Sequence, residues 1–435
     1  MFTELHLINF KIWQNVRLSL KPITLLLGAN SSGKSSLIQS LLLLRQTVKG
    51  EHSYQDLNFG VPESQDSVIL GKFKDVVRKS SLNYLAIQFS WHTSDQPDVP
   101  LSFAARYLEY PKGQASLDYL RLGTEKEFFT IERANYNIYS LRVGHERKSR
   151  GKSEDFRPEK SYYLSDKALE QLGPDGKKIK QISQMLFNEL TSLIYLGPVK
   201  RVAQRDYYWK GFMPQSIGDD GSNAIDILIA SDKEAQRERR KFKEPSGDGL
   251  IVQEVAKWLK KMDLADDLHI KRLGRSERYE VLVTRNESTS NLKDVGVGVS
   301  QVLPVIVAAL YAKPGHIVIL EEPESHLHPL AQSLLAELFA CIAKERNVQF
   351  IVETHSEHLF RRMQTLLANQ TITQEDCRMY FVEREGKDAH LRELFTNEYG
   401  ALTNWPEKFF GDALGETREQ ARLMFERQKQ ERQQS

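Results

Sequence analysis

The chain has 435 residues, of which 40% are hydrophobic and 27% are charged, a composition typical of a globular protein with a sizeable core. Its 60 Lys and Arg residues nearly balance 58 Asp and Glu residues, so the net charge of +2 argues against a polybasic protein that wraps nucleic acid along its whole length. No stretch of the sequence reaches the roughly 18 consecutive apolar residues that would predict a membrane span, and the first residues lack a signal-peptide pattern. The two cysteines, Cys341 and Cys377, match no disulfide or metal motif, so we expect a cytoplasmic protein.

The first 50 residues predict three strands and a helix. Apolar residues alternate in 5–10 and again in 16–20, which predicts two strands joined near Lys11. The continuous apolar run at 23–27 is typical of a buried central strand. A glycine-rich turn follows, and then a helix is predicted over 34–46.

The middle of the chain has a weaker pattern. Residues 50–130 predict loops with a few strands, for example at 82–91 and 101–108. The charged stretch 144–161 has no apolar period, which favours a loop, with a nucleic-acid contact as the alternative. Two helical segments are predicted after it, at 166–195 with a break at Gly173-Pro174, and at 224–243 with a basic end.

From residue 251 onward the pattern is regular. Helices are predicted at 251–262, 302–310, 330–345 and 357–367, strands at 269–273, 279–284, 316–320 and 348–352, and a hairpin at 379–395. Strands that alternate with helices indicate βαβ units and a largely parallel sheet.

The turn after the third strand carries the clearest chemical signal. Gly28-Ala29-Asn30-Ser31-Ser32-Gly33-Lys34-Ser35 matches the pattern G-x-x-x-x-G-K-[ST]. Backbone N–H groups of such a turn face phosphate oxygens, and the following helix N-terminus adds a favourable dipole. Lys34 can neutralise the β- and γ-phosphates, and the Ser35 hydroxyl can bind Mg²⁺. We therefore predict a site for ATP and Mg²⁺ with contacts from Asn30, Ser31, Ser32, Gly33, Lys34, Ser35 and Ser36.

A second signal is an apolar strand that ends in two carboxylates, Glu321 and Glu322. We expect Glu321 to hold the Mg²⁺ shell and Glu322 to position or deprotonate the attacking water. Two solvated acids at a strand end are the alternative, which Pro323-Glu324-Ser325-His326-Leu327-His328-Pro329 directly after them disfavours.

Two further signals complete the expected site. His355 follows the strand at 348–352 and is a second catalytic candidate, because it could hydrogen-bond a γ-phosphate. The turn at 294–301 precedes a helix and carries Ser300. One chain cannot easily place both this turn and the phosphate loop on one γ-phosphate. A symmetric dimer can, so Ser300 is predicted to act in trans.

These four elements, in this order, resemble the ATP-binding-cassette ATPases, and within them the soluble SMC/RecF/OLD-like branch. Asn9-Phe10-Lys11 is similar to the N-terminal turn of that branch, which implies that Lys11 lies near the nucleotide. From Ser35 to Gly296 the chain runs for about 260 residues, more than in transporter subunits, so an inserted lid is implied. The glutamine that such proteins place near the metal remains open between Gln46 and Gln88.

The segment Asn404-Trp405-Pro406-Glu407-Lys408-Phe409-Phe410 resembles a C-terminal element of the bacterial AAA15/AAA21-like ATPases, which include the PtuA-type ATPase subunits of Septu anti-phage systems. This resemblance implies a homodimer, or a higher oligomer built from dimers. It also implies a separately encoded effector, a nuclease. Residues 381–388 faintly resemble the start of a nuclease domain, but a hairpin is the better interpretation, and we expect no nuclease site in this chain.

The expected fold class is α/β. Residues 1–80 and 281–370 are predicted to form an ATPase head with a mixed, largely parallel sheet. Residues 81–280 are predicted to form an α+β lid for dimerisation or partner binding, and residues 371–435 a C-terminal hairpin and helical tail.

Two functions follow from these observations. The first is a regulatory ATPase of an anti-phage system that controls its effector. The alternative is a RecF-like repair or recombination ATPase that loads on DNA through basic clusters at 144–161 and 233–243.

Overall fold

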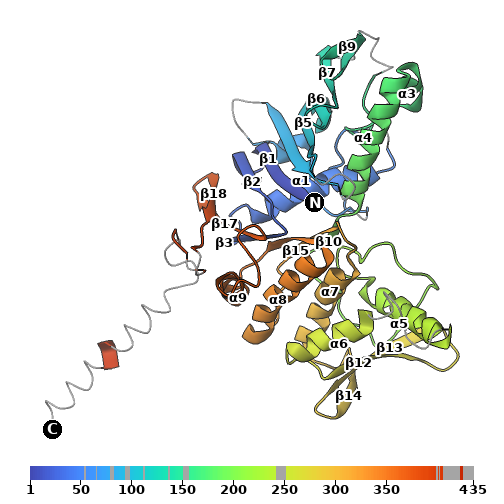
Figure 1. Cartoon of the computed structure of the whole chain (residues 1–435), viewed down its shortest axis with the longest axis vertical. Coiled ribbons are helices and arrows are strands. Elements are labelled where there is room, and N and C mark those ends of the chain that lie inside the picture. Colours follow the sequence, from blue (N-terminus) through green and yellow to red (C-terminus); the bar gives the residue numbers. More distant parts are fainter. Residues whose placement is uncertain are drawn as a thin grey trace.

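The computed structural model describes residues 1–52, 55–64, 66–78, 83–93, 98–110, 113–135, 138–149, 156–241, 251–397, 400, 402–404 and 422–424. Within these residues the strands form three sheets with helices around them (Figure 1).

A six-stranded sheet occupies the centre of the molecule. Its order is β10 (Ile194–Leu196), β15 (Ile317–Glu321), β16 (Gln349–Glu353), β3 (Ile23–Gly28), β17 (Cys377–Glu385) and β18 (Asp388–Leu394). The first five strands are parallel, and β18 runs antiparallel to β17. Strand β16 thus separates β3 from β15, and the carboxyl ends of all three strands meet at one edge of the sheet.

Both faces of this sheet are buried. Ile317 and Ile319 of β15 belong to one hydrophobic core, and the alternate residues Val318 and Leu320 belong to another. The helices of the first core include α1 (Lys34–Lys49) and α4 (Pro174–Thr191), and those of the second include α7 (Val297–Tyr311), α8 (Pro329–Arg346) and α9 (Glu357–Ala368). Burial on both faces explains why these strands read as continuous apolar runs.

The largest sheet is antiparallel, which corrects the largely parallel sheet that we predicted. Its order is β2 (Trp13–Ser19), β1 (Phe2–Phe10), β4 (Tyr84–Trp91), β5 (Leu101–Tyr110), β6 (Gln114–Gly123), β7 (Phe128–Asn135), β8 (Ile138–Val143) and β9 (Glu146–Ser149). Short connections join most of these strands, and a short turn can only join antiparallel neighbours. The alternation of strands and helices that indicated a parallel sheet applies to the central sheet alone.

The middle of the chain is more ordered than its pattern predicted. Strands β6, β7 and β8 were not predicted individually, and β9 begins inside the predicted loop 144–161. Residues 150–155 of that loop lie outside the described residues.

A third group of elements packs below the central sheet in Figure 1. It contains β11 (Tyr207–Tyr208), β12 (Asp267–Arg272), β13 (Arg278–Arg285) and β14 (Ser288–Asn291), with the helices α5 (Ala224–Lys241) and α6 (Ile251–Lys261). Both helices contact α7. Two short helices, α2 (Phe73–Val76) and α3 (Asp166–Gln171), complete the described set. None of the helices in the described part of the chain combines the length and apolar character needed to cross a membrane.

Strand pairing crosses the domain boundaries that we placed at residues 80 and 281. Strand β1 pairs with β4, and β10, from the predicted lid, pairs with β15 in the central sheet. The described part of 81–280 therefore contributes to all three sheets. The division into head, lid and tail stays a prediction about domain organisation.

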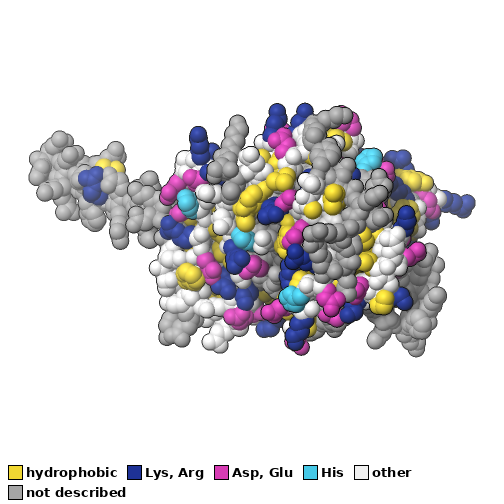
Figure 2. Space-filling model, turned by 90° about the horizontal axis from the view of Figure 1, so that it is seen from above, with side chains coloured by type: hydrophobic (Ala, Val, Ile, Leu, Met, Phe, Trp, Pro, Cys, Tyr) yellow, Lys and Arg dark blue, Asp and Glu magenta, His cyan; other side chains and the backbone are white. Residues whose placement is uncertain are grey.

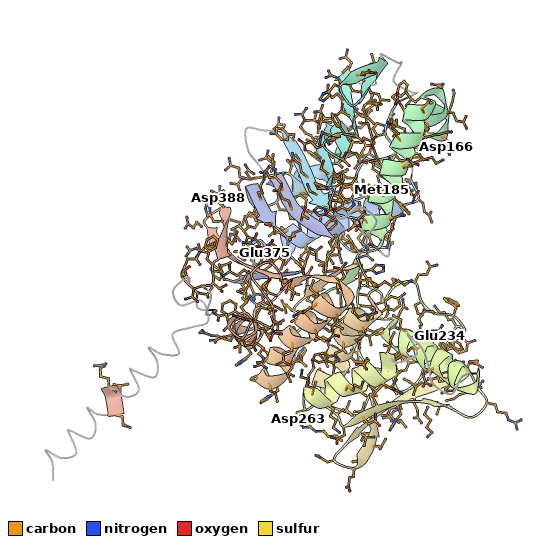
Figure 3. All side chains as sticks on the ribbon, in the orientation of Figure 1. Asp166, Met185, Glu234, Asp263, Glu375 and Asp388 are labelled. Atoms are coloured by element: carbon orange, nitrogen blue, oxygen red, sulfur yellow. The ribbon has the colours of Figure 1, made fainter. Side chains whose placement is uncertain are left out.

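The predicted C-terminal hairpin is confirmed as β17 and β18. Ion pairs of Glu375 with Lys21 and of Asp388 with Arg78 attach this region to the connection before β3 and to the segment after α2, and Figure 3 labels both acids. Beyond the hairpin, the Asn404 side-chain oxygen accepts from the Phe395 N–H at 2.9 Å. The rest of the predicted Asn-Trp-Pro element, and most of the predicted helical tail, lie outside the described residues.

The central sheet gives a test of stability. Ile319 is fully buried in the sheet, so Ile319→Ala should lower the free energy of unfolding by about 2–5 kcal/mol. Urea denaturation measures the change. The same substitution at Ile69, which is 54% exposed, should change it by no more than about 0.5 kcal/mol. Equal losses at the two positions would contradict the central place of this sheet in the core.

Candidate nucleotide-binding site

The glycine-rich turn connects β3 to α1, as predicted. Gly28 and Gly33 adopt φ angles of 147° and 115°, a backbone conformation that residues with a side chain rarely adopt. A Cβ on Gly28 would lie 2.4 Å from the Val382 carbonyl oxygen, and one on Gly33 would lie 2.8 Å from the Ile12 side chain. Only glycine therefore lets the turn wrap closely around the N-terminus of α1.

Lys34 is the first residue of α1, and its side chain is buried. Its Nζ atom donates hydrogen bonds to the carbonyl oxygens of Gly28 at 2.9 Å and Ala29 at 2.8 Å. Burial lowers the pKa of this ammonium group, and the nearby Glu353 carboxylate opposes that shift. Lys34 is thus held inside the turn, where a phosphate group would replace the two carbonyl oxygens as its partner.

Most of the predicted site residues meet in one cavity of about 550 Å³. The predicted residues that line it are Lys11, Asn30, Ser31, Ser32, Gly33, Lys34, Ser35, Ser36, Glu322 and His355. They come from the β1–β2 turn, the glycine-rich turn with α1, and the ends of β15 and β16. The cavity therefore lies at the edge of the central sheet where the carboxyl ends of β3, β15 and β16 meet.

Sequence reasoning missed Glu353, the last residue of β16. It is 5% exposed, and its Oε1 atom accepts a hydrogen bond from the Ser35 hydroxyl at 2.9 Å and lies 3.7 Å from the Lys34 Nζ atom. Burial raises the pKa of this carboxyl group, and Lys34 opposes the shift. The signal was available, because Glu353 ends an apolar strand just as Glu321 does.

Glu321 does not line the cavity, although we predicted it as the metal-shell residue. Its Oε1 atom accepts a hydrogen bond from the Tyr195 hydroxyl at 3.0 Å. Burial, together with the charge of Glu353, raises the pKa of Glu321 to about 7. The reason for this placement is topological: β16 lies between β15 and β3, so Glu353 is the carboxylate next to Ser35.

Glu322 and His355 face each other across the cavity. The two side chains approach to 4.0 Å between His355 Nε2 and Glu322 Oε1. Glu322 has a left-handed φ of 45°, and its N–H donates to the Glu353 carbonyl at 2.9 Å. Burial and the charge of Lys34 lower the pKa of His355, which favours a neutral imidazole at neutral pH. The His355 backbone N–H donates a hydrogen bond to the Oε1 atom of the buried Glu324 at 2.7 Å.

Lys200 supports this strand end from the opposite side and was not predicted. Its side chain is 4% exposed, and its Nζ atom donates to the carbonyl oxygens of Pro198 at 3.3 Å, Glu321 at 3.1 Å and Glu322 at 2.9 Å. Burial lowers the pKa of Lys200 to about 8. The segment after β10 is also bound to residues 218–221, because the Gly197 and Arg201 N–H groups donate to the Asp219 and Asp220 carbonyls.

Ser300 lies outside the cavity, on the first turns of α7. Its hydroxyl donates to the Val297 carbonyl oxygen at 2.9 Å, and it lines a small separate cavity with Val202 and Arg201. The predicted role of Ser300 toward another copy of the chain stays a prediction.

Neither glutamine that we considered reaches the cavity. At the far end of α1, the Gln46 side chain donates hydrogen bonds to the carbonyl oxygens of Asn58 and Val68. Gln88 lies beside His6 on the antiparallel sheet. The glutamine in the cavity is Gln39, which accepts a hydrogen bond from Lys11 Nζ. Gln39 follows Ser35 by one helical turn, a spacing that could have identified it.

Two other lining residues carried less sequence signal. Arg384 of β17 donates to the Ser31 carbonyl oxygen at 3.3 Å, and it reaches the turn only because β17 pairs with β3. Ile12 packs against Gly33 from the β1–β2 turn.

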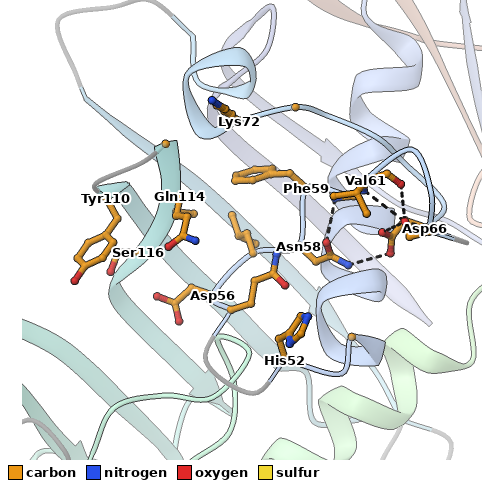
Figure 4. A pocket seen from close by; sticks show the side chains of 18 of the residues that line it. His52, Asp56, Asn58, Phe59, Val61, Asp66, Lys72, Tyr110, Gln114 and Ser116 are labelled. Carbon is orange, nitrogen blue, oxygen red and sulfur yellow. Dashed lines mark hydrogen bonds between the residues drawn. The ribbon is translucent and has the colours of Figure 1, made fainter.

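A second cavity, of about 1140 Å³, lies at the other end of α1 (Figure 4). It is lined by residues that follow α1 and by the hairpin of β5 and β6, including Asp56, Tyr110 and Gln114. The labelled Asn58 donates to Asp66 at 2.9 Å within its wall. None of the predicted nucleotide-site residues lines it.

The contacts of Lys200 predict its importance for turnover. Lys200→Met keeps the length of the side chain but leaves three carbonyl oxygens without their donor, so Glu322 should lose its position. We expect the ATP turnover rate to fall at least about tenfold, with less than about threefold change in nucleotide affinity. Lys257→Met, at an exposed ion pair with Glu254, is the control and should retain turnover. Wild-type turnover by the Lys200 variant would show that the three hydrogen bonds are dispensable.

Two family models match the chain. The family model described as an AAA ATPase domain (AAA_15) matches residues 1–360. A model described as a protein of unknown function (DUF3696) matches residues 372–420. No curated protein matches the chain.

Similar solved structures are head domains of SMC proteins. One is an SMC head bound to the C-terminal winged-helix domain of ScpA, with 14% identity, a TM-score of 0.49, and coverage of 90% of this chain and 97% of that chain. The SMC head from Thermotoga maritima has 10% identity, a TM-score of 0.44, and coverage of 91% and 99%. An SMC head with an extended coiled coil, bound to the C-terminal domain of ScpA and derived from Pyrococcus furiosus, has 13% identity, a TM-score of 0.44, and coverage of 90% and 96%.

The AAA ATPase match spans most of the 435 residues and includes every cavity residue except Arg384. The chain belongs to the AAA_15 family of AAA ATPase domains.

Proposed function

We propose that this chain binds and hydrolyses ATP with Mg²⁺, closes as an ATP-bound homodimer, and regulates a separately encoded effector nuclease in bacterial anti-phage defence. The observation that carries the ATPase part is the meeting of Lys34, Ser35, Glu322 and His355 in one cavity. These residues supply a phosphate cation, a metal-binding hydroxyl, a base and a polar contact for the γ-phosphate.

Phosphate binding would use groups that the turn already presents. The N-terminus of α1 favours negative charge, and its first N–H groups have no partner within the helix. Lys34 would exchange the Gly28 and Ala29 carbonyl oxygens for β- and γ-phosphate oxygens. Lys11, half-buried and held by Gln39, adds a second cation at the rim.

The hydrolytic step would be carried out by Glu322. Its carboxylate lines the cavity and can accept a proton from the attacking water. His355, whose pKa is lowered by burial and by the charge of Lys34, can hold that water or the γ-phosphate by a hydrogen bond. Mg²⁺ suits the hydroxyl and carboxylate oxygens beside the turn, and when bound it reduces the charge repulsion of the phosphates.

Dimer closure has support from the surface around Ser300. Val297 is 57% exposed, and Val202, which lines the small cavity with Ser300, is 67% exposed. Apolar side chains that gather beside a proposed trans residue are typical of a contact surface.

The defence role is proposed from the resemblance to PtuA-type ATPase subunits, carried by residues 404–410. Residues 381–388, which could have begun a nuclease domain, belong to the β17–β18 hairpin, so we assign the nuclease to another chain. The DNA-loading alternative has less support. On the face in Figure 2, Lys and Arg side chains are interspersed with Asp and Glu. In the basic cluster at 233–243, Lys233 is paired with Glu277, and the side chains of residues 237–243 lie outside the described part of the chain.

ATP-dependent closure can be tested with Glu322→Gln. This variant should bind ATP but not hydrolyse it, and light scattering after size exclusion should show a dimer when ATP and Mg²⁺ are present. Lys34→Ala should prevent nucleotide binding and therefore leave a monomer. Adding Ser300→Ala to Glu322→Gln should weaken the dimer, because the trans contact is lost. Hydrolysis at the wild-type rate by Glu322→Gln would show that another group activates the water.

The regulatory role requires a test of partners. Tagged Glu322→Gln protein, expressed from its native locus and purified with ATP and Mg²⁺, should retain a nuclease in fixed ratio, identified by mass spectrometry. Lys34→Ala is the matched control and should retain less of it if closure controls the partner. Recovery of DNA without a protein partner, in a salt-sensitive manner, would favour the repair ATPase instead.

A further inference from the structure

Glu353 occupies the strand end closest to the phosphate turn. In the register of the central sheet it pairs with Leu26 of β3 on one side and with Glu321 of β15 on the other. Of these two adjacent glutamates, only Glu353 lines the nucleotide cavity. The sheet order therefore gives two similar buried carboxylates with different access to the site.

The contacts of Glu353 are incomplete. Oε1 accepts from the Ser35 hydroxyl at 2.9 Å and lies 3.7 Å from Lys34 Nζ. Oε2 is buried and has no hydrogen-bond partner among the described residues. An ionised carboxylate oxygen that is buried without a partner is costly, so this group has unused capacity to bind a cation.

We infer that Glu353, together with Ser35, forms the protein part of the Mg²⁺ shell, and that Glu321 does not bind the metal directly. This inference rests on the proposed ATPase function. Ligands of Mg²⁺ lie about 2.1 Å from the ion in an octahedron, which places adjacent ligand atoms about 3 Å apart. The separation of 2.9 Å between Ser35 Oγ and Glu353 Oε1 matches that spacing.

The surroundings of Glu321 explain the second half of the inference. Its Oε1 atom accepts a hydrogen bond from the Tyr195 hydroxyl at 3.0 Å, and its backbone carbonyl oxygen accepts one from Lys200 Nζ. One whole strand lies between Glu321 and the turn that carries Ser35. Glu321 therefore contributes to the packing of the strand end and to the local charge.

The pairing of Glu353 with Lys34 gives the metal a second effect. Without metal, the carboxylate attracts the ammonium group that the phosphates need and repels the phosphates themselves. A Mg²⁺ ion on Glu353 and Ser35 would compensate that negative charge and leave Lys34 to the nucleotide. Metal should thus strengthen nucleotide binding through Glu353.

The matched variants Glu353→Gln and Glu321→Gln separate the two carboxylates. Each replaces a carboxyl group by an amide and keeps the size of a buried side chain, at the ends of two neighbouring strands. The affinity of a fluorescent ADP analogue is measured for each full-length variant in EDTA and in Mg²⁺. The binding of Mn²⁺ to the ADP complex is measured by electron paramagnetic resonance, which does not depend on turnover.

We expect Glu353→Gln to bind the ADP analogue in EDTA at least as tightly as the wild type. It should lose most of the gain in affinity that Mg²⁺ gives, and its Mn²⁺ affinity should fall at least about tenfold. Glu321→Gln should keep both properties within about threefold of the wild type. A purely structural role for Glu353 would instead weaken binding in EDTA as well.

Other results would overturn the inference. Loss of the metal effect in Glu321→Gln but not in Glu353→Gln would assign the metal to Glu321, as we first predicted. Weaker binding of Glu353→Gln in EDTA, or an unchanged metal effect in that variant, would also reject it. If the wild-type protein bound no nucleotide in either condition, the proposed function itself would fail, which distinguishes the two conclusions.

Discussion

The six-stranded sheet is buried on both faces, and the position of the site follows from that constraint. Alternate residues of β15 enter different hydrophobic cores, so neither face can hold a polar ligand. Polar and charged groups can gather only where the strands end. The turn after β3 and the acids after β15 and β16 lie at that edge because these three strands are parallel neighbours.

Charge compensation then determines the chemistry of this edge. Four carboxylates and two lysines lie there with much of their surface out of water: Glu321, Glu322, Glu324, Glu353, Lys34 and Lys200. Burial raises the pKa of Glu321 to about 7 and lowers that of Lys200 to about 8. The backbone carbonyls held by Lys200 keep the strand end in place, and Lys34 partly neutralises Glu353. A cluster of this kind is sensitive to the arrival of phosphate and metal charges.

Several features of the site were readable from local sequence, because each depends on a few neighbouring residues. The glycine-rich turn, Lys34, Ser35, Glu322 and His355 were predicted and meet in one cavity. Glu353, Lys200 and Arg384 were missed, because their contacts depend on strand order, on the loop after β10 and on the pairing of β17 with β3. The antiparallel sheet was missed for a similar reason. Its strands were partly visible, but their partners lie on both sides of the phosphate turn in the chain.

The sequence by itself determined the strand–turn–helix that presents Lys34 and Ser35, since Gly28 and Gly33 are needed for that local backbone. It also determined that acids follow two buried strands, since apolar runs and their ends are local patterns. Only the tertiary structure decided which acid lies next to Ser35. That choice depends on the position of β16 between β3 and β15. The pairing of β16 with β3 joins segments more than 300 residues apart along the chain, which no local pattern specifies.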